Sequence, residues 1–360
     1  MLIPVNLAER SYDIEIGSGN LPGAAEFFGA RVPLKHVVVV TDGNVAASHA
    51  PTVVDSLEQA GTRVDLVIVE PGETTKSIEN ADRLWQRLLE VGADRSSSVV
   101  AVGGGVVGDL AGFVAATYAR GIALLQVPTT LLAQVDSSVG GKVGVNLPDA
   151  KNMVGAFWQP RGVLIDTDVL STLPAREFRA GMAEVVKYGV ILDADFFGYL
   201  EQHVEAIKAR QPDVLRHLIA RSCQLKADVV QADERELTGR RVVLNYGHTF
   251  CHAIEAVTGY GHFLHGEAVA IGMLCASRLA ELLGRVDQRV TRRQHDLLTA
   301  LELPTEVPEV DRSQLITAMQ RDKKTQYGRL RFVLPSRLGH VELVDDIPAN
   351  LVTSAMNYNS

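Results

Sequence analysis

"SSVVAVGGGVVGDLAGF", residues 97–113, joins a run rich in valine to three consecutive glycines and then to an apolar stretch with helical character. A short apolar run that ends in glycine is typical of a buried strand, and the glycines after it predict a tight turn into a helix. This strand–turn–helix unit decides the fold, because the same alternation recurs on both sides of it.

Four further runs predict strands of the same parallel sheet: "HVVVVTD" (36–42), "RVDLVIVE" (63–70), "IALLQVP" (122–128) and "VLIDTDV" (163–169). Between residues 77 and 92, apolar residues repeat at helical spacing and Gly92 is a plausible helix end. The alternation predicts a Rossmann-like, doubly wound α/β domain with a mostly parallel sheet.

Helical periodicity dominates after residue 172, and only "LRFVLP" and "HVELV" near the end are typical of a hairpin. We therefore expect an α/β domain over residues 1–172 and a mostly α-helical domain over residues 173–360. Because no low-complexity linker separates them, we expect the domains to pack with the active site in the cleft between them.

Composition excludes several classes of function. The net charge of -8 argues against a nucleic-acid-binding protein of the bulk electrostatic kind. The cysteines Cys223, Cys251 and Cys275 form none of the close pairs of zinc ribbons or redox motifs, which indicates a reduced, cytoplasmic setting. The first residues lack a signal-peptide pattern, and the most apolar helical run carries Arg278. We expect a soluble protein without a membrane partner.

The glycine-rich turn has features of a nucleotide site. Gly103, Gly105 and Gly108 fit the pattern G-x-G-x-x-G, which lets backbone amides approach a pyrophosphate. The acidic residue expected roughly twenty positions later in dehydrogenases is missing, and Asp109 follows the third glycine instead. The standard dehydrogenase fingerprint is a poor match, and a tight turn without a ligand remains an alternative.

Polar residues follow the predicted strands at their carboxyl ends, where open parallel sheets bind ligands. Each of them could instead be a helix cap or turn former, but their shared location favours a ligand site. They are Asp42 and Asn44 after the first strand, Glu73 and Lys76 after the second, and Thr129 and Thr130 after the fourth.

Residues 136–160, "DSSVGGKVGVNLPDAKNMVGAFWQP", predict a glycine-rich loop that carries Asp136, Lys142, Lys151 and Asn152. Ammonium and amide donors satisfy oxyanions, so this loop suits a phosphorylated or carboxylated small molecule. Exposed lysines on a flexible loop are the alternative interpretation.

Several residues of the second half are candidate metal ligands. Glu184 and Lys187 share a helix face, which usually means a solvated ion pair, but their apolar neighbours indicate a buried helix. His248 and His252 are four apart, as in many zinc sites, although Thr249 replaces the glutamate of H-E-x-x-H and a zinc-protease site is excluded.

Two more histidines lie nearby. His262 falls in a glycine-rich turn and is most simply a loop residue, whereas His265 precedes an apolar helix. Spacing alone does not decide whether His265 faces inward.

Six segments, in order, carry a family resemblance: "GGGVVGDLAGFVAATYARG", "QVPTTLLAQVDSSVGGKVGVN", "KNMVGAFWQP", "GMAEVVKYG", "LNYGHTFCHAIEA" and "LHGEAVAIGM". Together they resemble the 3-dehydroquinate synthase family, sugar-phosphate cyclases of the shikimate pathway that serve aromatic amino-acid biosynthesis. The resemblance runs from about residue 36 to "RDKK" near residue 324 and is specific because the whole ordered set matches.

The resemblance implies an NAD-binding N-terminal domain, a helical domain with a divalent metal, zinc or else cobalt, and a homodimer. The implied reaction converts 3-deoxy-arabino-heptulosonate 7-phosphate to 3-dehydroquinate and phosphate. It proceeds through transient NAD-dependent oxidation, phosphate elimination, reduction, ring opening and intramolecular aldol closure.

The resemblance also implies roles for individual residues. The metal ligands would be Glu184, His248 and His265, with His252 facing the substrate instead. Arg120 resembles an arginine that reaches the phosphate from a neighbouring subunit. The other substrate positions are Lys142, Asn152, Lys187, Lys226, Arg241, Asn245 and Lys324. The NAD positions are Asp42, Asn44, Glu73, Lys76, Gly105, Asp109, Thr129, Thr130, Lys142, Lys151 and Thr172.

The sequence departs from the family pattern at two places. An extra residue, Leu237 or Thr238, precedes "GRR", so Arg241 is preferred to Arg240 on its distance from Asn245. Cys251 stands where glycine is common, and we expect a small packed residue next to the metal motif.

Three other functions compete with the synthase. A sister sugar-phosphate cyclase would use the same scaffold, but the substrate carboxylate explains the donor set that includes Lys226, Asn245 and His252. A metal-dependent polyol dehydrogenase would accumulate NADH. A non-catalytic NAD-binding protein is disfavoured by the presence of the complete set of metal ligands and lysines.

Overall fold

The computed structural model describes residues 1–148, 150–259, 261–321 and 330–357. The chain folds into two compact units, of which the first comprises residues 1–173 and 215–235 and the second residues 174–214 and 236–360. Among the described residues, no helix is long and apolar enough to cross a membrane.

The first unit is built on a sheet of seven strands in the order β1-β2-β9-β6-β5-β3-β4. All neighbours are parallel except β1 and β2, which pair antiparallel. The strands are β1 (Leu2–Val5), β2 (Tyr12–Gly17), β3 (His36–Asp42), β4 (Arg63–Val69), β5 (Ser98–Gly103), β6 (Ala123–Pro128) and β9 (Gly162–Asp166). The five strands predicted from apolar runs are β3, β4, β5, β6 and β9.

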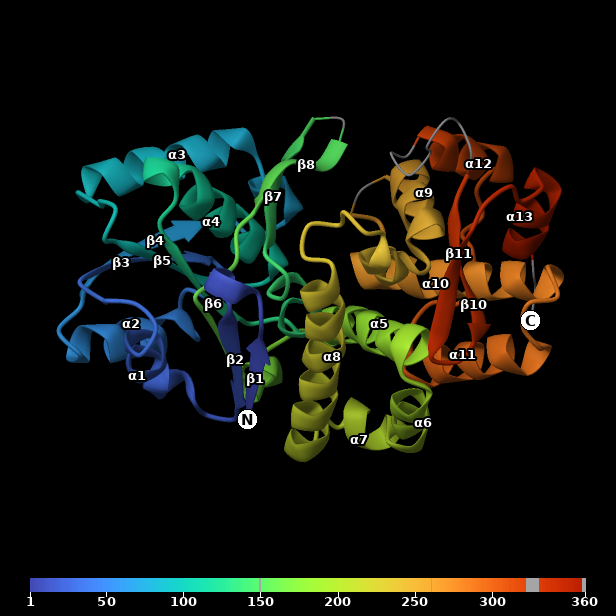
Figure 1. Cartoon of the computed structure of the whole chain (residues 1–360), viewed down its shortest axis with the longest axis horizontal. Coiled ribbons are helices and arrows are strands. Elements are labelled where there is room, and N and C mark those ends of the chain that lie inside the picture. The colour runs from blue at the N-terminus through green and yellow to red at the C-terminus, as the bar shows by residue number, and fades with distance from the viewer. Residues whose placement is uncertain (149, 260, 322–329, 358–360) are drawn as a thin grey trace. The chain divides into compact units, whose positions relative to one another are not determined.

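Helices cover both faces of this sheet, with α3 and α4 on one side and α1 and α2 on the other (Figure 1). Val38, Val99 and Leu110 belong to the apolar core in which α4 packs on the central strands. This two-sided burial explains why β3 and β5 carry continuous apolar runs, Val37–Val40 and Val99–Val102, rather than alternating apolar and polar residues. The helices are α1 (Ala24–Gly29), α2 (Ala50–Gln59), α3 (Ile78–Glu90) and α4 (Gly105–Thr117).

The structure corrects one prediction: where we expected a glycine-rich loop, residues 142–157 form a hairpin of β7 (Lys142–Leu147) and β8 (Ala150–Phe157). Gly144 and Gly155 pair across it, and a Cβ on Gly155 would lie 2.4 Å from the carbonyl oxygen of Val143. Gly144 and Gly155 therefore mark the place where the two strands approach each other closely. Val143 and Val145 anchor the hairpin in the apolar core of the first unit.

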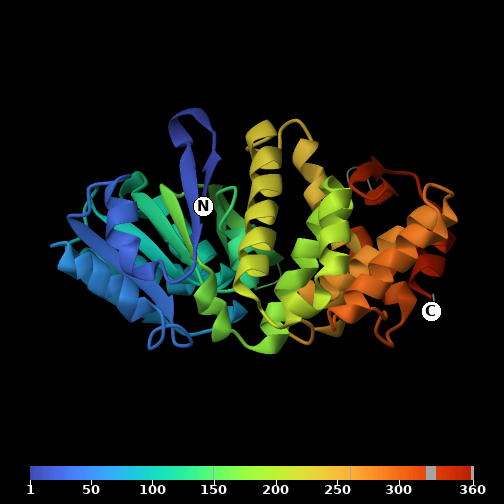
Figure 2. The ribbon, with the colours of Figure 1, turned by 90° about the horizontal axis from the view of Figure 1, so that it is seen from below.

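The two units do not divide simply between residues 172 and 173, as we expected. Residues 215–235, which include most of the long helix α8 (Pro212–Ala232), pack with the first unit. Cys223 donates to the carbonyl oxygen of Gln134 (3.2 Å), and Arg10 pairs with Glu234 (2.7 Å). Figure 2 shows α8 beside the hairpin of β1 and β2. No local sequence pattern indicates that a helix inside the helical half returns to the α/β unit. The assignment of functions to the two domains stays a prediction.

The remaining elements of the first unit are single turns: η1 (Ala8–Arg10), η2 (Leu21–Gly23), η3 (Glu73–Thr75), η4 (Tyr118–Arg120), η5 (Ala133–Ser137), a π-helical turn, and η6 (Thr167–Ser171).

The second unit is mostly helical and is organised around α10 (His265–Leu282), which contacts α5, α9, α11, α13 and β10. Fourteen of its residues are buried, from Gly266 to Ala280. The other elements are α5 (Ala175–Leu192), α6 (Ala194–Gln202), α7 (Val204–Lys208), η7 (Arg240–Asn245), α9 (His248–Thr258), α11 (Gln288–Ala300), α12 (Arg312–Arg321) and α13 (Ala349–Met356), with the predicted hairpin formed by β10 (Phe332–Arg337) and β11 (His340–Val344).

Glycines allow α10 to approach its neighbours closely. A Cβ on Gly266 would lie 1.8 Å from the carbonyl oxygen of Ala180 in α5. A Cβ on Gly272 would lie 2.3 Å from the carbonyl oxygen of Gly247, which precedes α9. These close approaches fix the first turn of α10 against α5 and the start of α9 against α10.

Candidate active site

The carboxyl edge of the parallel sheet carries the polar residues that we predicted there. Asp42 ends β3, and its Oδ1 accepts the backbone N–H of Asn44 (2.9 Å). The N–H of Thr129, directly after β6, donates to the carbonyl oxygen of Gly103 at the end of β5 (3.0 Å). Glu73 lies in η3, after β4. One edge of the first unit thus combines carboxylates, hydroxyls and a glycine turn.

The glycine turn leads into α4, whose N-cap is Gly104 with no side-chain cap. The first amides of such a helix lack intrahelical acceptors and can bind an anion. The turn is closely packed, because a Cβ on Gly104 would lie 3.0 Å from Thr130 and a Cβ on Gly105 would lie 3.0 Å from the hydroxyl of Ser137. The first backbone amides of α4, which no side chain caps, suit the oxygens of a pyrophosphate.

The buried Lys76 is the centre of a polar network beside this turn. Its ammonium donates to Asp109 Oδ2 (2.7 Å) and to Asn152 Oδ1 (2.5 Å), and it lies 3.8 Å from Glu73 Oε1. Only 4% of the Lys76 side chain is exposed. Burial disfavours the ammonium, but Asp109 and Glu73 favour it more, so the pKa of Lys76 is raised. The ammonium of Lys76 therefore links three other predicted residues, Glu73, Asp109 and Asn152.

Asn146 completes this network, although no motif in the sequence singles it out. Its Nδ2 donates to Glu73 Oε1 (2.8 Å), and its Oδ1 accepts the N–H of Asn152 (2.8 Å). Asn152 has a φ of 54°, a left-handed conformation that needs such local support. An asparagine in a glycine-rich segment resembles a turn former, so only the structure identifies Asn146 as the link between η3 and the hairpin.

The other predicted positions of the first unit are more dispersed. Lys226 in α8 donates to Asp136 twice, to its carbonyl oxygen and to Oδ1, both at 2.7 Å. The Thr172 hydroxyl lies 2.8 Å from His49 Nε2. Lys142 begins β7 with an exposed side chain, and Lys151 lies in β8.

Arg120 is exposed on a strained turn. Ala119 and Arg120 have φ values of 50° and 69°, and a Cβ on the following Gly121 would lie 2.3 Å from the ring of Trp158. The Trp158 indole N–H donates to the carbonyl oxygen of Ile122 (3.0 Å). The turn is thus held in an uncommon conformation by a fixed indole, with an arginine at its tip.

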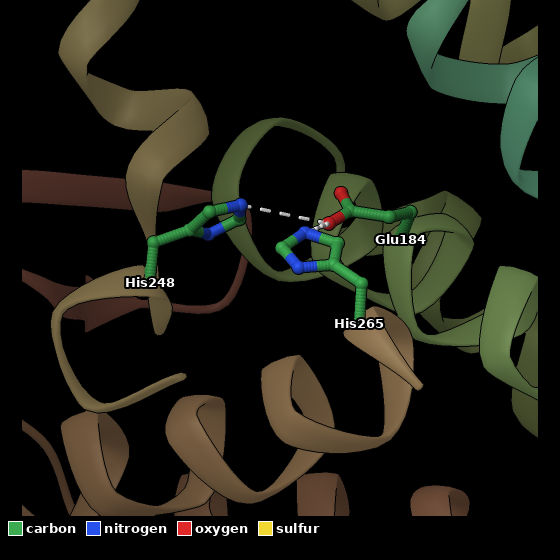
Figure 3. Close-up of side chains that lie close together, drawn as sticks. All are labelled: Glu184, His248 and His265. Atoms are coloured by element: carbon green, nitrogen blue, oxygen red, sulfur yellow. Dashed lines mark ion pairs between the residues drawn. The ribbon is translucent and has the colours of Figure 1, made fainter. Parts of the chain in front are cut away.

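Glu184, His248 and His265 lie together in the second unit and form a group that could hold a metal ion (Figure 3). Glu184 Oε1 lies 3.7 Å from His248 Nε2 and 3.9 Å from His265 Nε2. The glutamate comes from the middle of α5, and each histidine is the first residue of its helix, α9 or α10. The close packing at Gly266 and Gly272 brings these positions together.

Each histidine has a partner for its other nitrogen. His248 Nδ1 lies 3.1 Å from the carbonyl oxygen of Tyr246, which can only accept, so Nδ1 carries the proton and Nε2 presents a lone pair. His265 Nδ1 lies 3.6 Å from Glu255 Oε1 and 3.8 Å from Cys251 Sγ. Burial disfavours the charged imidazole of His265, but Cys251 and Glu255 favour it more, so its pKa is raised well above the ordinary value.

Glu184 and Lys187 form an ion pair through Oε2, and their side chains are only 1% and 2% exposed. The solvated pair that we held as an alternative is therefore excluded. Two ions in an apolar helix face are costly unless they are paired, and the pair leaves Oε1 directed at the two imidazoles.

The remaining predictions have mixed outcomes. His252 is not in either metal-competent group of the described residues, although its ring centroid lies 5.7 Å from that of His248. Arg241 is 2% exposed and lies 3.7 Å from Glu236, whereas Arg240 is exposed. Asn245 ends η7 and is half-buried. Lys324 lies outside the described residues. His262 is an exposed loop residue, as predicted.

Comparisons with known proteins agree over nearly the whole chain. The family profile described as 3-dehydroquinate synthase N-terminal matches residues 66–180, and that described as 3-dehydroquinate synthase C-terminal matches residues 181–325. The chain is 51% identical to the 3-dehydroquinate synthase of Rhodopirellula baltica, with 98% of this chain and 96% of that protein covered. It is 47% identical to that of Nostoc punctiforme, with 99% and 98% covered.

Two solved structures are similar in fold and, more distantly, in sequence. The 2-deoxy-scyllo-inosose synthase complexed with carbaglucose-6-phosphate, NAD+ and Co2+ has a TM-score of 0.90 at 28% identity, with 99% of both chains covered. The 2-epi-5-epi-valiolone synthase of Streptomyces hygroscopicus with NAD+ and Zn2+ bound has a TM-score of 0.89 at 28% identity, covering 98% of this chain and 97% of that chain.

Proposed function

The chain belongs to the 3-dehydroquinate synthase family, and we propose that it uses NAD and a divalent metal held by Glu184, His248 and His265 to convert 3-deoxy-arabino-heptulosonate 7-phosphate to 3-dehydroquinate and phosphate. Members of this family are phosphorus–oxygen lyases, and this chain is one by its full-length similarity. The observation that carries the metal proposal is the convergence of two imidazole nitrogens on one buried carboxylate oxygen.

The donor set fits a catalytic zinc or cobalt ion. One carboxylate oxygen and two imidazole nitrogens are the ligands that zinc uses in catalytic sites, where three protein ligands leave a position for substrate. The Tyr246 carbonyl fixes His248 in the tautomer that metal binding needs. When bound, the metal supplies a Lewis acid that acidifies a hydroxyl and polarises a carbonyl.

The nucleotide proposal is supported by the first unit. Backbone amides at the start of α4 would face the pyrophosphate, and the Lys76 network would hold the surrounding carboxylates and amides in place. When bound, NAD supplies a reversible hydride acceptor. The proposed NAD contacts are Asp42, Asn44, Glu73, Lys76, Gly105, Asp109, Thr129, Thr130, Lys142, Lys151 and Thr172.

Basic and amide side chains would bind the substrate. Lys187 places an ammonium beside Glu184, and Arg241 is a second buried cation of the same unit, so both suit the carboxylate or phosphate of an anionic substrate. His252 lies one helical turn after His248 and would contact substrate rather than metal. The other proposed contacts are Lys142, Asn152, Lys226, Asn245 and Lys324.

Arg120 supports a proposal of shared active sites in a homodimer. An arginine held exposed on a strained turn is costly to maintain unless it has a task, and we assign it to the phosphate in a neighbouring subunit. Mixing inactive Arg120→Ala with inactive His248→Ala should restore part of the activity if subunits exchange. Exchange without any recovery would contradict the shared site.

Product analysis tests the reaction and separates it from the alternatives. Incubation with NAD, zinc or cobalt, and the heptulosonate phosphate should give equal amounts of phosphate and dehydroquinate without net NADH. Steady NADH formation would instead indicate a polyol dehydrogenase. Phosphate release only from a hexose or heptulose phosphate that lacks a carboxylate would indicate a sister cyclase. The sequence favours the synthase, because the chain is 51% identical to a 3-dehydroquinate synthase and 28% identical to the two solved cyclases.

A further inference from the structure

A second group of potential metal ligands lies next to the proposed metal site. Cys251 and Glu255 are four apart in α9, and Cys251 Sγ lies 3.8 Å from Glu255 Oε2 and 3.8 Å from His265 Nδ1. The group of Cys251, Glu255 and His265 is one of two in the described residues that could hold a metal. Cys251 and Glu255 are only 0% and 5% exposed.

His265 belongs to both groups through opposite ring nitrogens. Nε2 faces Glu184, whereas Nδ1 faces Glu255 and Cys251. A neutral imidazole has one lone pair, on either Nδ1 or Nε2, and the other nitrogen carries a proton. A metal on Nδ1 therefore leaves Nε2 as a donor that cannot ligate, and the reverse also holds.

We propose that Cys251, Glu255 and Nδ1 of His265 form a second metal position, selective for thiophilic divalent ions, and that its occupation excludes metal from the site of Glu184, His248 and His265. The chain would thus contain an inhibitory metal position that shares one ligand with its catalytic one.

The chemistry of the two ligand sets explains the difference in selectivity. Cys251 adds a soft sulfur donor that the first set lacks, and a thiolate favours a soft ion such as Cd²⁺ over borderline Zn²⁺, which the first set of two imidazoles and a carboxylate suits. On binding, the Cys251 thiol would lose its proton to solvent, since the thiolate is the metal ligand.

Charge balance also favours an ion at the second position. The thiolate, the Glu255 carboxylate and a divalent cation together are neutral, so the ion would be stable among buried groups. The first set has one carboxylate, which already contacts the Lys187 ammonium, so a divalent ion there keeps positive charge for an anionic substrate. A metal at the second position would be neutralised and would not serve the reaction.

Cadmium titration of the metal-free protein tests the proposal. We expect an ultraviolet thiolate-to-metal absorption band to develop with one Cd²⁺ per chain. Cys251→Ala and Cys251→Ser should both lack the band, with folding checked by circular dichroism. Cys275→Ala is the matched control, because Cys275 is also buried, in α10, but belongs to neither group of ligands, and it should keep the band.

The second readout is inhibition, and only this part rests on the proposed function. Cd²⁺ should suppress the zinc-supported reaction of the wild type, whereas Cys251→Ala should need at least tenfold more Cd²⁺ for the same loss. Glu184→Gln should lose activity but keep the cadmium band, because Glu184 is not a ligand of the second position. A band that survives Cys251→Ala, or one bound Cd²⁺ without any band in the wild type, would overturn the second site whatever the activity shows.

Discussion

Replacing Asp109 by asparagine should destabilise the first unit, because it leaves the Lys76 ammonium buried without its nearest carboxylate. The two atoms lie 2.7 Å apart, and only 4% of Lys76 and 20% of Asp109 are exposed. Removing one partner of a buried pair typically costs about 3–5 kcal/mol. Glu73 remains 3.8 Å from the ammonium and Asn152 still accepts from it, so we expect a smaller loss than this range, about 2–3 kcal/mol.

Urea unfolding followed by tryptophan fluorescence measures this effect. Both tryptophans of the chain, Trp85 and Trp158, lie in residues 1–173, so the signal reports on the first unit. With a slope of about 2 kcal/mol per molar urea, the midpoint should fall by roughly 1 M. The double variant Lys76→Met, Asp109→Asn should recover part of the loss, since no buried charge is left unpaired and Glu73 is 44% exposed.

Glu79→Gln is the control for this experiment, because it breaks the exposed pair of Glu79 and Arg83 in α3. Exposed pairs contribute about 0.3–0.5 kcal/mol, so its midpoint should barely move. If Asp109→Asn shifts the midpoint no more than Glu79→Gln does, the pair of Lys76 and Asp109 does not stabilise the carboxyl edge of the sheet.

Three further variants or treatments test other parts of the structure. Gly266→Ala should disturb the packing of α10 on α5, because its Cβ would lie 1.8 Å from the Ala180 carbonyl oxygen, and it should therefore lower the amount of metal bound per chain. Gly198→Ala is the control, because a Cβ there would meet nothing within 4 Å, and it should leave the bound metal unchanged. Asn146→Ala removes two hydrogen bonds, each worth about 1 kcal/mol, and should weaken NAD binding by up to about thirtyfold in calorimetric titration. Unchanged affinity would show that the hairpin needs no such link. Burial raises the pKa of Cys223 and Cys275 to about 12 and also raises that of Cys251, so the thiols stay protonated and should react with a thiol reagent at pH 8 only after unfolding; rapid labelling of the native protein would contradict their burial.

Strands β3, β5, β6 and β9 were predictable from sequence because they are buried on both faces, whereas β1 and β2 were not predicted. The run from His36 to Asp42 contains four consecutive valines, is buried in all but its last residue and has the bounds of β3. The hairpin of β7 and β8 was not predictable, since Gly144 and Gly155 indicate a loop by composition and act as a close strand contact only once the strands are paired. The placement of α8 with the first unit depends on tertiary interactions such as that of Lys226 with Asp136, which no local pattern encodes.

The candidate metal site shows where local reasoning ends. Helical spacing favoured His248 with His252, whereas the structure groups His248 with His265 and with Glu184, which is 64 residues before His248 in the sequence. Motif resemblance assigned the same three ligands, because the family pattern carries tertiary information that spacing lacks. The proximity of Cys251 and Glu255 to His265 could not be predicted, since it depends on how α9 and α10 meet.

The metal content of purified variants decides whether Glu184, His248 and His265 are the metal ligands. We predict about one zinc per chain for the wild type and for His252→Ala, which should turn over slowly, and almost none for His248→Ala. Both variants alter histidines one turn apart in α9, so they share any general effect on the helix. Equal loss of zinc in His248→Ala and His252→Ala, or full zinc in both, would contradict the assignment of Glu184, His248 and His265 as the catalytic metal site.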